Sequence, residues 1–482
     1  MRASIAAESA GIPSVSIICE GFAGQAAATA RGLGYDGLPL AVTVGHVDAQ
    51  SVEEMTANFV HTTINHIIAG LTVDQAIETD SNAEPAALDV AATGTIDGII
   101  EHFIAMGWSD GNAIIPPTRE RVERFLDGSG HDPWKTVGVS PSSGRDLTIW
   151  SIAVNAVMAG CRPEHLPILI AITQILADPD YGSEHSGNTT GADALIIVDG
   201  PNTTALGFNT GPGAQREGTH ANTSVGRWLR LYLRNVCGFT AHEHDKATFG
   251  NPARPVLAED HDRLRSINSS VHWPSVAEQL GFHWSDDVVS MARMNSGLLI
   301  GSVFGSTPDE IIPYLANGLA RVAAWDLTHV HGLGTDQYQP LLVLSPLLAK
   351  TFATAGWDLP QVRAALFEHA RIPAQTFERF IGDWTNLTAG HPKLTDLVAD
   401  GTLPHVFAES DNPDRPVPIV TRPERLLVAV AGDPNRANAY AFSNDGPHGW
   451  WTAKRIDHTP ASDLVCNIGG DCAPPTSPSV HT

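Results

Sequence analysis

Short strand-type segments alternate with longer helix-type segments along much of this chain. Near the start, the β-rich apolar runs at residues 14–19 and 38–44 are each followed by a helix-type segment, at residues 21–33 and 51–71. Such alternation is typical of parallel strands joined by crossover helices. The sequence therefore predicts an α/β protein. Its first part reads as a small doubly wound parallel sheet that is incomplete, because a helix precedes the first strand.

The chain has 482 residues, which exceeds one ordinary hydrophobic core, so more than one domain is expected. We expect a small α/β domain at residues 1–78 and a linker at 79–95. A larger mixed α/β domain follows at 96–459, and the Pro/Ser-rich residues 460–482 form a flexible tail. In the larger domain the pattern predicts helices at 97–106, 119–126, 147–158, 166–176, 222–236, 308–323 and 359–370. It predicts strands at 194–198, 288–294, 298–304, 341–344 and 426–431.

The charge balance limits the partners of the chain. Lys and Arg number 29 against 53 Asp and Glu, a formal net charge of -24. Such a surface repels nucleic-acid phosphates and anionic lipid headgroups, so neither nucleic acid nor a membrane is an expected partner. Five cysteines without a CxxC pair predict no disulfide scaffold. No apolar run is long enough for a membrane helix, and no secretory signal is evident, so a cytoplasmic location is expected.

The strongest local signal is the segment from Val198 to Arg234. A buried strand leads into a Gly/Asn-rich loop, which enters a helix carrying three arginines on one face. Glycines permit close backbone approach, and a helix N-terminus offers free N–H groups with positive potential. We expect this segment to bind a small polar or anionic substrate through Asn202, Asn209, Gly211, Gly213, Asn222 and Arg227. The alternative is a long ordered loop held together by its own asparagine side chains.

Four residues have side chains suited to acid–base or nucleophilic chemistry, and they are Asp110, His220, His331 and Cys161. Asp110 lies in a Trp-Ser-Asp-Gly-Asn turn and is otherwise a turn or cap residue. Cys161 lies between two helices, where Arg162 and the next helix N-terminus favour a thiolate with a lowered pKa. A buried structural cysteine is the alternative.

Two histidine pairs raise a second possibility, a divalent metal site. His242 and His244 flank a glutamate, and His329 and His331 alternate along a predicted strand that places both on one face. These four are the candidate metal ligands, although their spacing forms no established motif. No other cofactor is indicated.

Several motifs resemble a known family. Residues 9–15 (Ser-Ala-Gly-Ile-Pro-Ser-Val) and the helix after them resemble the back half of the UGSC-type (seleno)protein domain, which is similar to the B component of glycine/sarcosine/betaine reductases. Trp108-Ser109-Asp110-Gly111, the run from Asn155 to Glu164 and the Asn209–Arg234 segment resemble the large domain often found with it. The resemblance covers about residues 1–70 and 95–455.

The resemblance implies thiol or selenol redox chemistry on a small molecule. The family's Cys/Sec-Gly-Ser-Cys motif is expected before the first helix and is absent from this chain. It therefore lies upstream, on another subunit, or has been lost. We expect an enzyme that cleaves a small polar or anionic molecule by reductive or lyase-type chemistry, as a homo-oligomer or with a subunit that carries the missing half. The alternatives are a metal-assisted hydrolase or hydratase, and a non-catalytic subunit that binds a thiol-bearing partner.

Overall fold

The computed structural model describes residues 2–32, 35, 37–45, 50–72, 87–241, 244–250, 256–267, 271–385, 390–446 and 450–458, with two short strands, β14 (Val465–Cys466) and β15 (Cys472–Ala473). The predicted linker is thus described only from residue 87, and most of the predicted tail lies outside the described residues. None of the described helices is long and apolar enough to cross a membrane.

Residues 2–72 contain the helix–strand alternation that the sequence predicts. Strands β1 (Ser16–Cys19) and β2 (Leu40–Thr43) pair in parallel, with α2 (Ala23–Gly32) between them in sequence. The long helix after β2 consists of α3 (Val52–Asn58), a π-helical turn η3 (Phe59–Thr63) and α4 (Ile64–Thr72). Ser51 begins this helix with a capping box, because its side chain and that of Glu54 each bond the other's backbone N–H. The parallel pair at this end is therefore confirmed.

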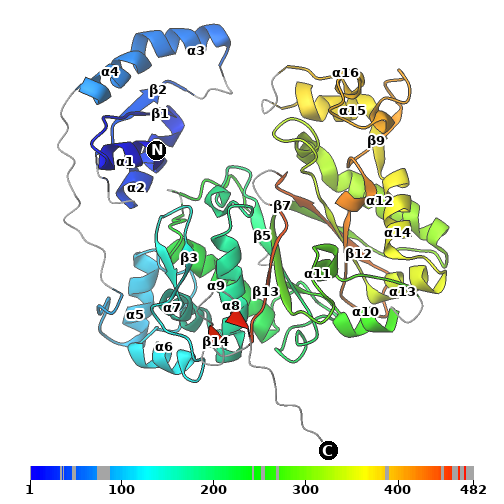
Figure 1. The fold of residues 1–482 in the computed structure, drawn as a ribbon, viewed down its shortest axis with the longest axis horizontal. Helices are drawn as coiled ribbons and strands as arrows, with labels where there is room; N and C mark the ends of the chain where they lie inside the picture. Colours follow the sequence, from blue (N-terminus) through cyan, green and yellow to red (C-terminus); the bar gives the residue numbers. More distant parts are fainter. Residues whose placement is uncertain are drawn as a thin grey trace, which may run out of the picture.

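The rest of the chain is built on a seven-stranded mixed sheet in the order β11-β8-β12-β7-β5-β6, with β13 also pairing with β7. Strands β5, β7, β12 and β13 of this sheet can be followed in Figure 1. Its strands are β5 (Asp193–Asp199), β6 (Val256–Ala258), β7 (Val288–Ile300), β8 (Leu341–Leu344), β11 (Leu427–Val430), β12 (Ala439–Asn444) and β13 (Thr452–Arg455). The α/β class predicted from the sequence is confirmed, and the sheet combines parallel and antiparallel pairs.

The order of the strands is symmetric about the middle of the sheet. β5 pairs in parallel with β6 and antiparallel with β7, and β8 pairs in parallel with β11 and antiparallel with β12. β7 and β12 then join the two halves as antiparallel neighbours. Each half is thus a strand, a helical crossover, a parallel strand and a returning strand. No repeat in the sequence reveals this arrangement.

Helices cover the outer faces of the two halves. The first half packs against α8 (Leu166–Leu176) and α9 (His220–Asn235). Helices α5 (Ile96–Ala105), α6 (Arg119–Leu126) and α7 (Ile149–Ala159) contribute to the same apolar core. The second half packs against α12 (Pro308–Ala323), α13 (Pro346–Thr354) and α14 (Leu359–His369). Both α7 and α8 are apolar around most of their circumference, which is typical of helices buried on all sides.

The inner face of the sheet has its own apolar core, to which Leu195, Ala292, Val343 and Ala429 contribute. The two outer strands approach each other at their ends, because Asp260 N–H donates to Val430 O at 2.8 Å. The sheet therefore curls toward a barrel.

The short helix α11 (Val276–Gln279) packs against β7 and β11 at the seam between the two outer strands. Its Gln279 side chain donates to Val428 O at 2.6 Å and accepts from Val428 N–H at 3.1 Å. This amide takes the hydrogen-bonding role that a neighbouring strand would have beside β11.

Three sequence predictions differ from the structure. The strands expected at 288–294 and 298–304 are one strand, β7. The arginine-bearing helix begins at His220, two residues earlier than expected. The alternation of His329 and His331 on a strand is wrong, because a 3-10 helix, η6 (Ala324–His329), occupies this segment.

Candidate functional site

The asparagines of the loop after β5 are engaged within the protein. Asn202 donates from its backbone and side-chain nitrogens to the two carboxylate oxygens of Asp287, at 2.9 and 2.6 Å. Asn209 accepts from Gly211 N–H and donates to Pro212 O. Asn222 accepts from Asn209 N–H and donates to Val256 O. These contacts show how asparagine side chains order the loop. Substrate binding by these residues and by Gly213 stays a prediction.

The first turn of α9 lies away from the cavities described below. His220 is its first residue, is exposed, and has its ring 5.9 Å from the ring of buried His165. Neither His220 nor His331 lines either cavity. Neither histidine therefore lies beside Asp110 in the lining of these cavities.

The structure does bring Asp110 and Arg227 together, although 117 residues separate them. The Arg227 guanidinium donates from Nε and Nη2 to both oxygens of Asp110, at 3.1 and 3.0 Å. Its Nη2 also donates to Ala113 O at 2.7 Å. The side chains are only 17% and 7% exposed, so this two-point pair fixes the 110–113 turn against the middle of α9.

A polar pocket of about 190 Å³ lies between the second half of α9, the loop before β5 and the segment at 245–250. Its charged lining residues are Asp110, Asp193, Asp245, Arg230, Arg234 and Arg293. Arg230 pairs with Asp193, and Arg234 donates to Gly107 O at 3.3 Å. The arginine face that the sequence predicts on α9 therefore does border a small charged cavity, but at the opposite end of the helix from its N-terminus.

Arg293 is the most unusual group in this polar pocket. It lies on β7 and is 1% exposed. Its Nη1 donates to Tyr181 O and Gly182 O at 3.1 and 2.9 Å, and its Nε is 3.6 Å from an oxygen of Asp445. Its Nη2 is buried and has no acceptor at normal hydrogen-bond geometry among the described residues, and the guanidinium also interacts with the buried Tyr181 side chain. A buried guanidinium N–H without an acceptor is costly, and the oxygen of an anionic ligand would satisfy it.

A buried polar network lies behind Arg293. Asp445 accepts from Asn188 of the loop before β5 at 2.7 Å. Asn295, two residues beyond Arg293 on β7, donates to Asp326 at 2.7 Å. Burial raises the pKa of Asp326 to about 7. The guanidinium is thus held by groups from two separate parts of the chain, residues 181–182 and Asp445, and Asn188 in turn orients Asp445.

Glycines allow the walls of the polar pocket to approach closely. Gly191 has φ +79°, and a Cβ there would lie 2.6 Å from Gly250 N. Thr248 N–H donates to Thr189 O at 3.0 Å across the same contact. A side chain at position 191 would therefore separate the two segments that form the wall.

We expect Gly191→Ala to lower the free energy of unfolding by about 2–4 kcal/mol, because it combines a left-handed backbone with a clash. Gly207→Ala is the matched control. Gly207 has φ +84°, but a Cβ there meets nothing within 4 Å, so only about 1 kcal/mol is expected. Urea unfolding of both variants measures the difference. Equal losses would show that the contact with Gly250 has no role.

Cys161 does not have the lowered pKa of a reactive thiolate, and its burial agrees with the alternative of a structural cysteine. Its thiol is buried and donates to Ser224 O at 3.3 Å, and burial raises its pKa to about 12. Cys237, two residues beyond α9, is also buried, with its pKa raised to about 12. A protonated thiol is a poor nucleophile, so the structure opposes attack by Cys161 in its present environment.

The described residues contain no cluster of side chains that would support the alternative of a metal site. No group of three or more His, Cys, Asp or Glu side chains placed to hold a metal ion occurs among them. His244, His329 and His331 are described, and His242 lies outside the described residues. Within the described residues, the Nδ1 atom of His244 contacts Thr240 Oγ1 at 2.6 Å rather than another ligand.

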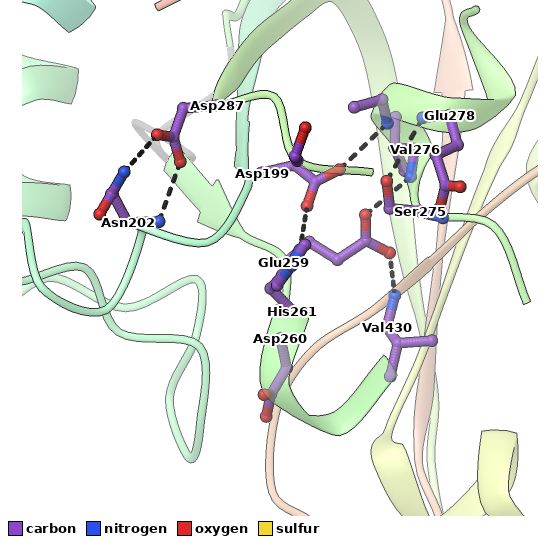
Figure 2. Close-up of polar contacts among 12 residues, drawn as sticks. Asp199, Asn202, Glu259, Asp260, His261, Ser275, Val276, Glu278, Asp287 and Val430 are labelled. Carbon is purple, nitrogen blue, oxygen red and sulfur yellow. Dashed lines mark hydrogen bonds and ion pairs between the residues drawn. The ribbon is translucent and has the colours of Figure 1, made fainter. Parts of the chain in front are cut away.

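A cluster of buried carboxylates closes the seam of the sheet (Figure 2). Glu259 accepts from Val276 N–H at 2.7 Å and from Val430 N–H at 2.8 Å. Asp199 accepts from Ala277 N–H at 3.2 Å and lies 3.6 Å from the His261 ring. Burial first, and the Asp199 charge second, raise the pKa of Glu259 well above its usual value of 4.5. This cluster joins β6, α11 and β11.

Stability should consequently fall as pH rises. The native protein holds the Glu259 proton more tightly than the unfolded chain, so the free energy of unfolding decreases from about pH 4.5 up to the folded-state pKa. Asp199→Asn keeps an acceptor for Ala277 N–H and removes the neighbouring charge. We expect it to raise stability at pH 8 by roughly 1 kcal/mol and to flatten the decline.

Urea unfolding at pH 5, 6, 7 and 8 measures this effect. Asp127→Asn, at the exposed end of α6, is the control that changes net charge equally. An unchanged slope in Asp199→Asn would contradict the coupling of the two carboxylates.

The residues that sequence reasoning missed carry recognisable signals. Arg293 is a single charged residue within an apolar strand, Val-Val-Ser-Met-Ala-Arg-Met. The loop at 182–192 is a polar run with three glycines directly before buried β5. Both features favour a site, because a buried charge requires a partner and long ordered loops are often functional.

Comparison with known proteins adds a family assignment for the first part of the chain. The family model of the UGSC family matches residues 1–73. Searches against curated proteins and solved structures gave no match. The resemblance predicted for residues 95–455, and the relation to reductase B components, therefore stay predictions. The resemblance predicted for the N-terminal part is confirmed, because the UGSC family model matches residues 1–73.

Proposed function

We propose that this chain is an enzyme, or the catalytic subunit of one, that binds a small anionic substrate in the polar pocket. The observation that carries the proposal is the buried Arg293 guanidinium, whose Nη2 lacks an acceptor at normal hydrogen-bond geometry among the described residues. A carboxylate or phosphate oxygen placed there would complete its hydrogen bonding. Arg234 would contribute a second positive charge from α9, and a two-arginine clamp orients a planar anion well.

The same pocket offers a group for proton transfer. Asp110 lines it and is oriented by the two-point contact with Arg227. In our proposal Arg234 and Arg293 hold the anionic group and stabilise the charge that develops on it, and Asp110 is the acid–base candidate. Lyase-type cleavage suits this set of groups. A reductive reaction would need a thiol from outside this pocket, because no cysteine is among its lining residues. Burial also raises the pKa values of Cys161 and Cys237 to about 12.

Ligand-induced stabilisation tests the proposed function. At low ionic strength, acetate, oxalate and phosphate are each titrated while the melting temperature is followed. We expect at least one of them to raise it in a saturable way. Arg234→Gln should abolish the rise. The control, Arg124→Gln on exposed α6, should retain it, because Arg124 pairs only at the surface with Glu120. Equal responses in both variants would exclude Arg234 from the binding site.

A second function, binding of a partner chain, is favoured by an apolar stripe on the helix after β2. Val60, Ile64, Ile68 and Leu71 are spaced along one helical face and are 40–54% exposed. Single exposed apolar residues are ordinary, whereas an aligned stripe is typical of a surface that another element covers. Full turnover by a monomeric chain, measured with sedimentation of the same sample, would contradict the need for such a partner.

A further inference from the structure

A second and larger cavity adjoins the polar pocket. Its volume is about 910 Å³, and it lies between α5, α7, the end of α9 and the segment at 87–92. Arg234 and Phe239 line both cavities, so the two share a wall at the end of α9. A molecule whose charged end contacts Arg234 in the polar pocket therefore lies beside this second space.

The larger cavity is suited to an apolar body. Phe103, Trp108, Trp150, Val154 and Met158 form much of its lining. The Phe103 and Trp108 rings meet edge to face at 5.3 Å, and Trp150 stacks on Trp134 at 5.4 Å. These contacts fix the aromatic walls in place, so the space does not depend on flexible side chains.

One buried polar atom in the wall of the larger cavity, Asn235 Oδ1, lacks a hydrogen-bond donor among the described residues. The Nδ2 of Asn235 donates to Trp108 O at 3.0 Å and to Asn155 Oδ1 at 2.9 Å. Both partners are oxygens, so the orientation of the amide is fixed. The Asn235 Oδ1 atom is buried and has no donor among the described residues. A hydroxyl or N–H group on a ligand would satisfy it.

We propose that the substrate is an amphipathic acid, with its carboxylate or phosphate at Arg234 and Arg293 and an acyl or aryl body in the larger cavity. A donor group on that body meets Asn235 Oδ1. This inference rests on the proposed function, since it assigns the rest of the molecule whose anionic end the polar pocket binds. It divides recognition between a charged end, which sets orientation, and an apolar body, which supplies affinity.

A series of straight-chain carboxylates tests whether the charged end and the apolar body of the substrate bind in the two separate cavities. Calorimetry with acetate, butyrate, hexanoate and octanoate should show affinity rising about fourfold for each added CH₂ that the cavity buries. Trp108 and Trp150 line the cavity, so their fluorescence should respond to octanoate and not to acetate. An affinity that is independent of chain length would overturn the inference while leaving the proposed function in place.

Two substitutions that fill the larger cavity with a bigger side chain test whether the apolar body of the ligand binds there. Val154→Trp and the smaller Val154→Phe should weaken octanoate binding by about 100-fold and about 10-fold, and leave acetate binding unchanged. Retained acetate binding shows that the protein is folded. Val139→Trp, on exposed β3 (Thr136–Val139), is the control and should bind octanoate normally.

The remaining outcomes separate the two proposals. If no carboxylate of any length binds, and neither oxalate nor phosphate raises the melting temperature, both the inference and the proposed function are wrong. If neutral octanol binds as tightly as octanoate, and Arg234→Gln leaves octanoate binding unchanged, the larger cavity works independently of the polar pocket and the inference is overturned. Loss of octanoate binding in Arg234→Gln, together with chain-length dependence, supports it.

Discussion

Arg293→Met is expected to lower the affinity for the anionic ligand by at least about 100-fold. Truncating one partner of a buried charge-assisted contact typically costs 2–5 kcal/mol, and Met fills most of the same space without a charge. The loss should appear in the dissociation constant measured by calorimetry or by competition. It should be present for short and long ligands alike, because Arg293 would contact only their anionic end.

The same substitution also affects stability, so a second variant is needed. Removal of Arg293 takes away the guanidinium that lies 3.6 Å from buried Asp445, which should cost about 3 kcal/mol of unfolding free energy. Arg293→Lys keeps a positive charge but loses the planar fork, so it should retain more stability and still bind at least about 10-fold more weakly. Wild-type affinity in a folded Arg293→Lys or Arg293→Met protein would exclude Arg293 from the anion site.

Asp110→Ala and Arg227→Ala are each expected to destabilise the protein by about 3 kcal/mol, because each leaves a charge in a largely buried position without its two-point partner. The double variant should cost about as much as either single one, since the second substitution removes the charge that the first left unpaired. Urea unfolding of the four proteins gives the coupling energy directly.

Surface ion pairs provide the control for this cycle. Arg124→Ala on α6 breaks a pair whose side chains are 67% and 82% exposed, so a loss of no more than about 0.5 kcal/mol is expected. Additive effects of Asp110→Ala and Arg227→Ala would contradict the pairing.

Asp110→Asn leaves one acceptor for the Arg227 guanidinium, so it should lose less stability than Asp110→Ala. It should still lose activity if Asp110 transfers a proton.

Local sequence signals predict many elements of the fold because they depend on neighbouring residues alone. The apolar helix Leu166–Leu176 and the helix Pro308–Ala323 have the predicted bounds. Thr118 caps α6, accepting from Arg121 N–H. By contrast, β7 reads as two strands, because Asn295, Ser296 and Gly297 interrupt its apolar pattern. That interruption lies where β7 changes its neighbours from β5 and β13 to β12.

The candidate site depends on contacts that no local pattern contains. The sequence identifies Asp110 and Arg227 separately, but only packing of the 110–113 turn on α9 brings them together. It identifies a helix N-terminus as the anion site, whereas the charged cavity lies along the other half of the same helix. The burial that raises the pKa of Cys161 likewise arises from elements that pack around it, which the neighbouring sequence does not reveal.

The most direct test of the account is the position of a bound anion. A crystal of the full chain grown with selenate allows the anion to be located by its anomalous signal. The account predicts selenate in the polar pocket, within hydrogen-bond distance of Arg293 Nη2 and close to Arg234. Selenate bound only at the first turn of α9 or on the outer surface, with none beside Arg293, would contradict it.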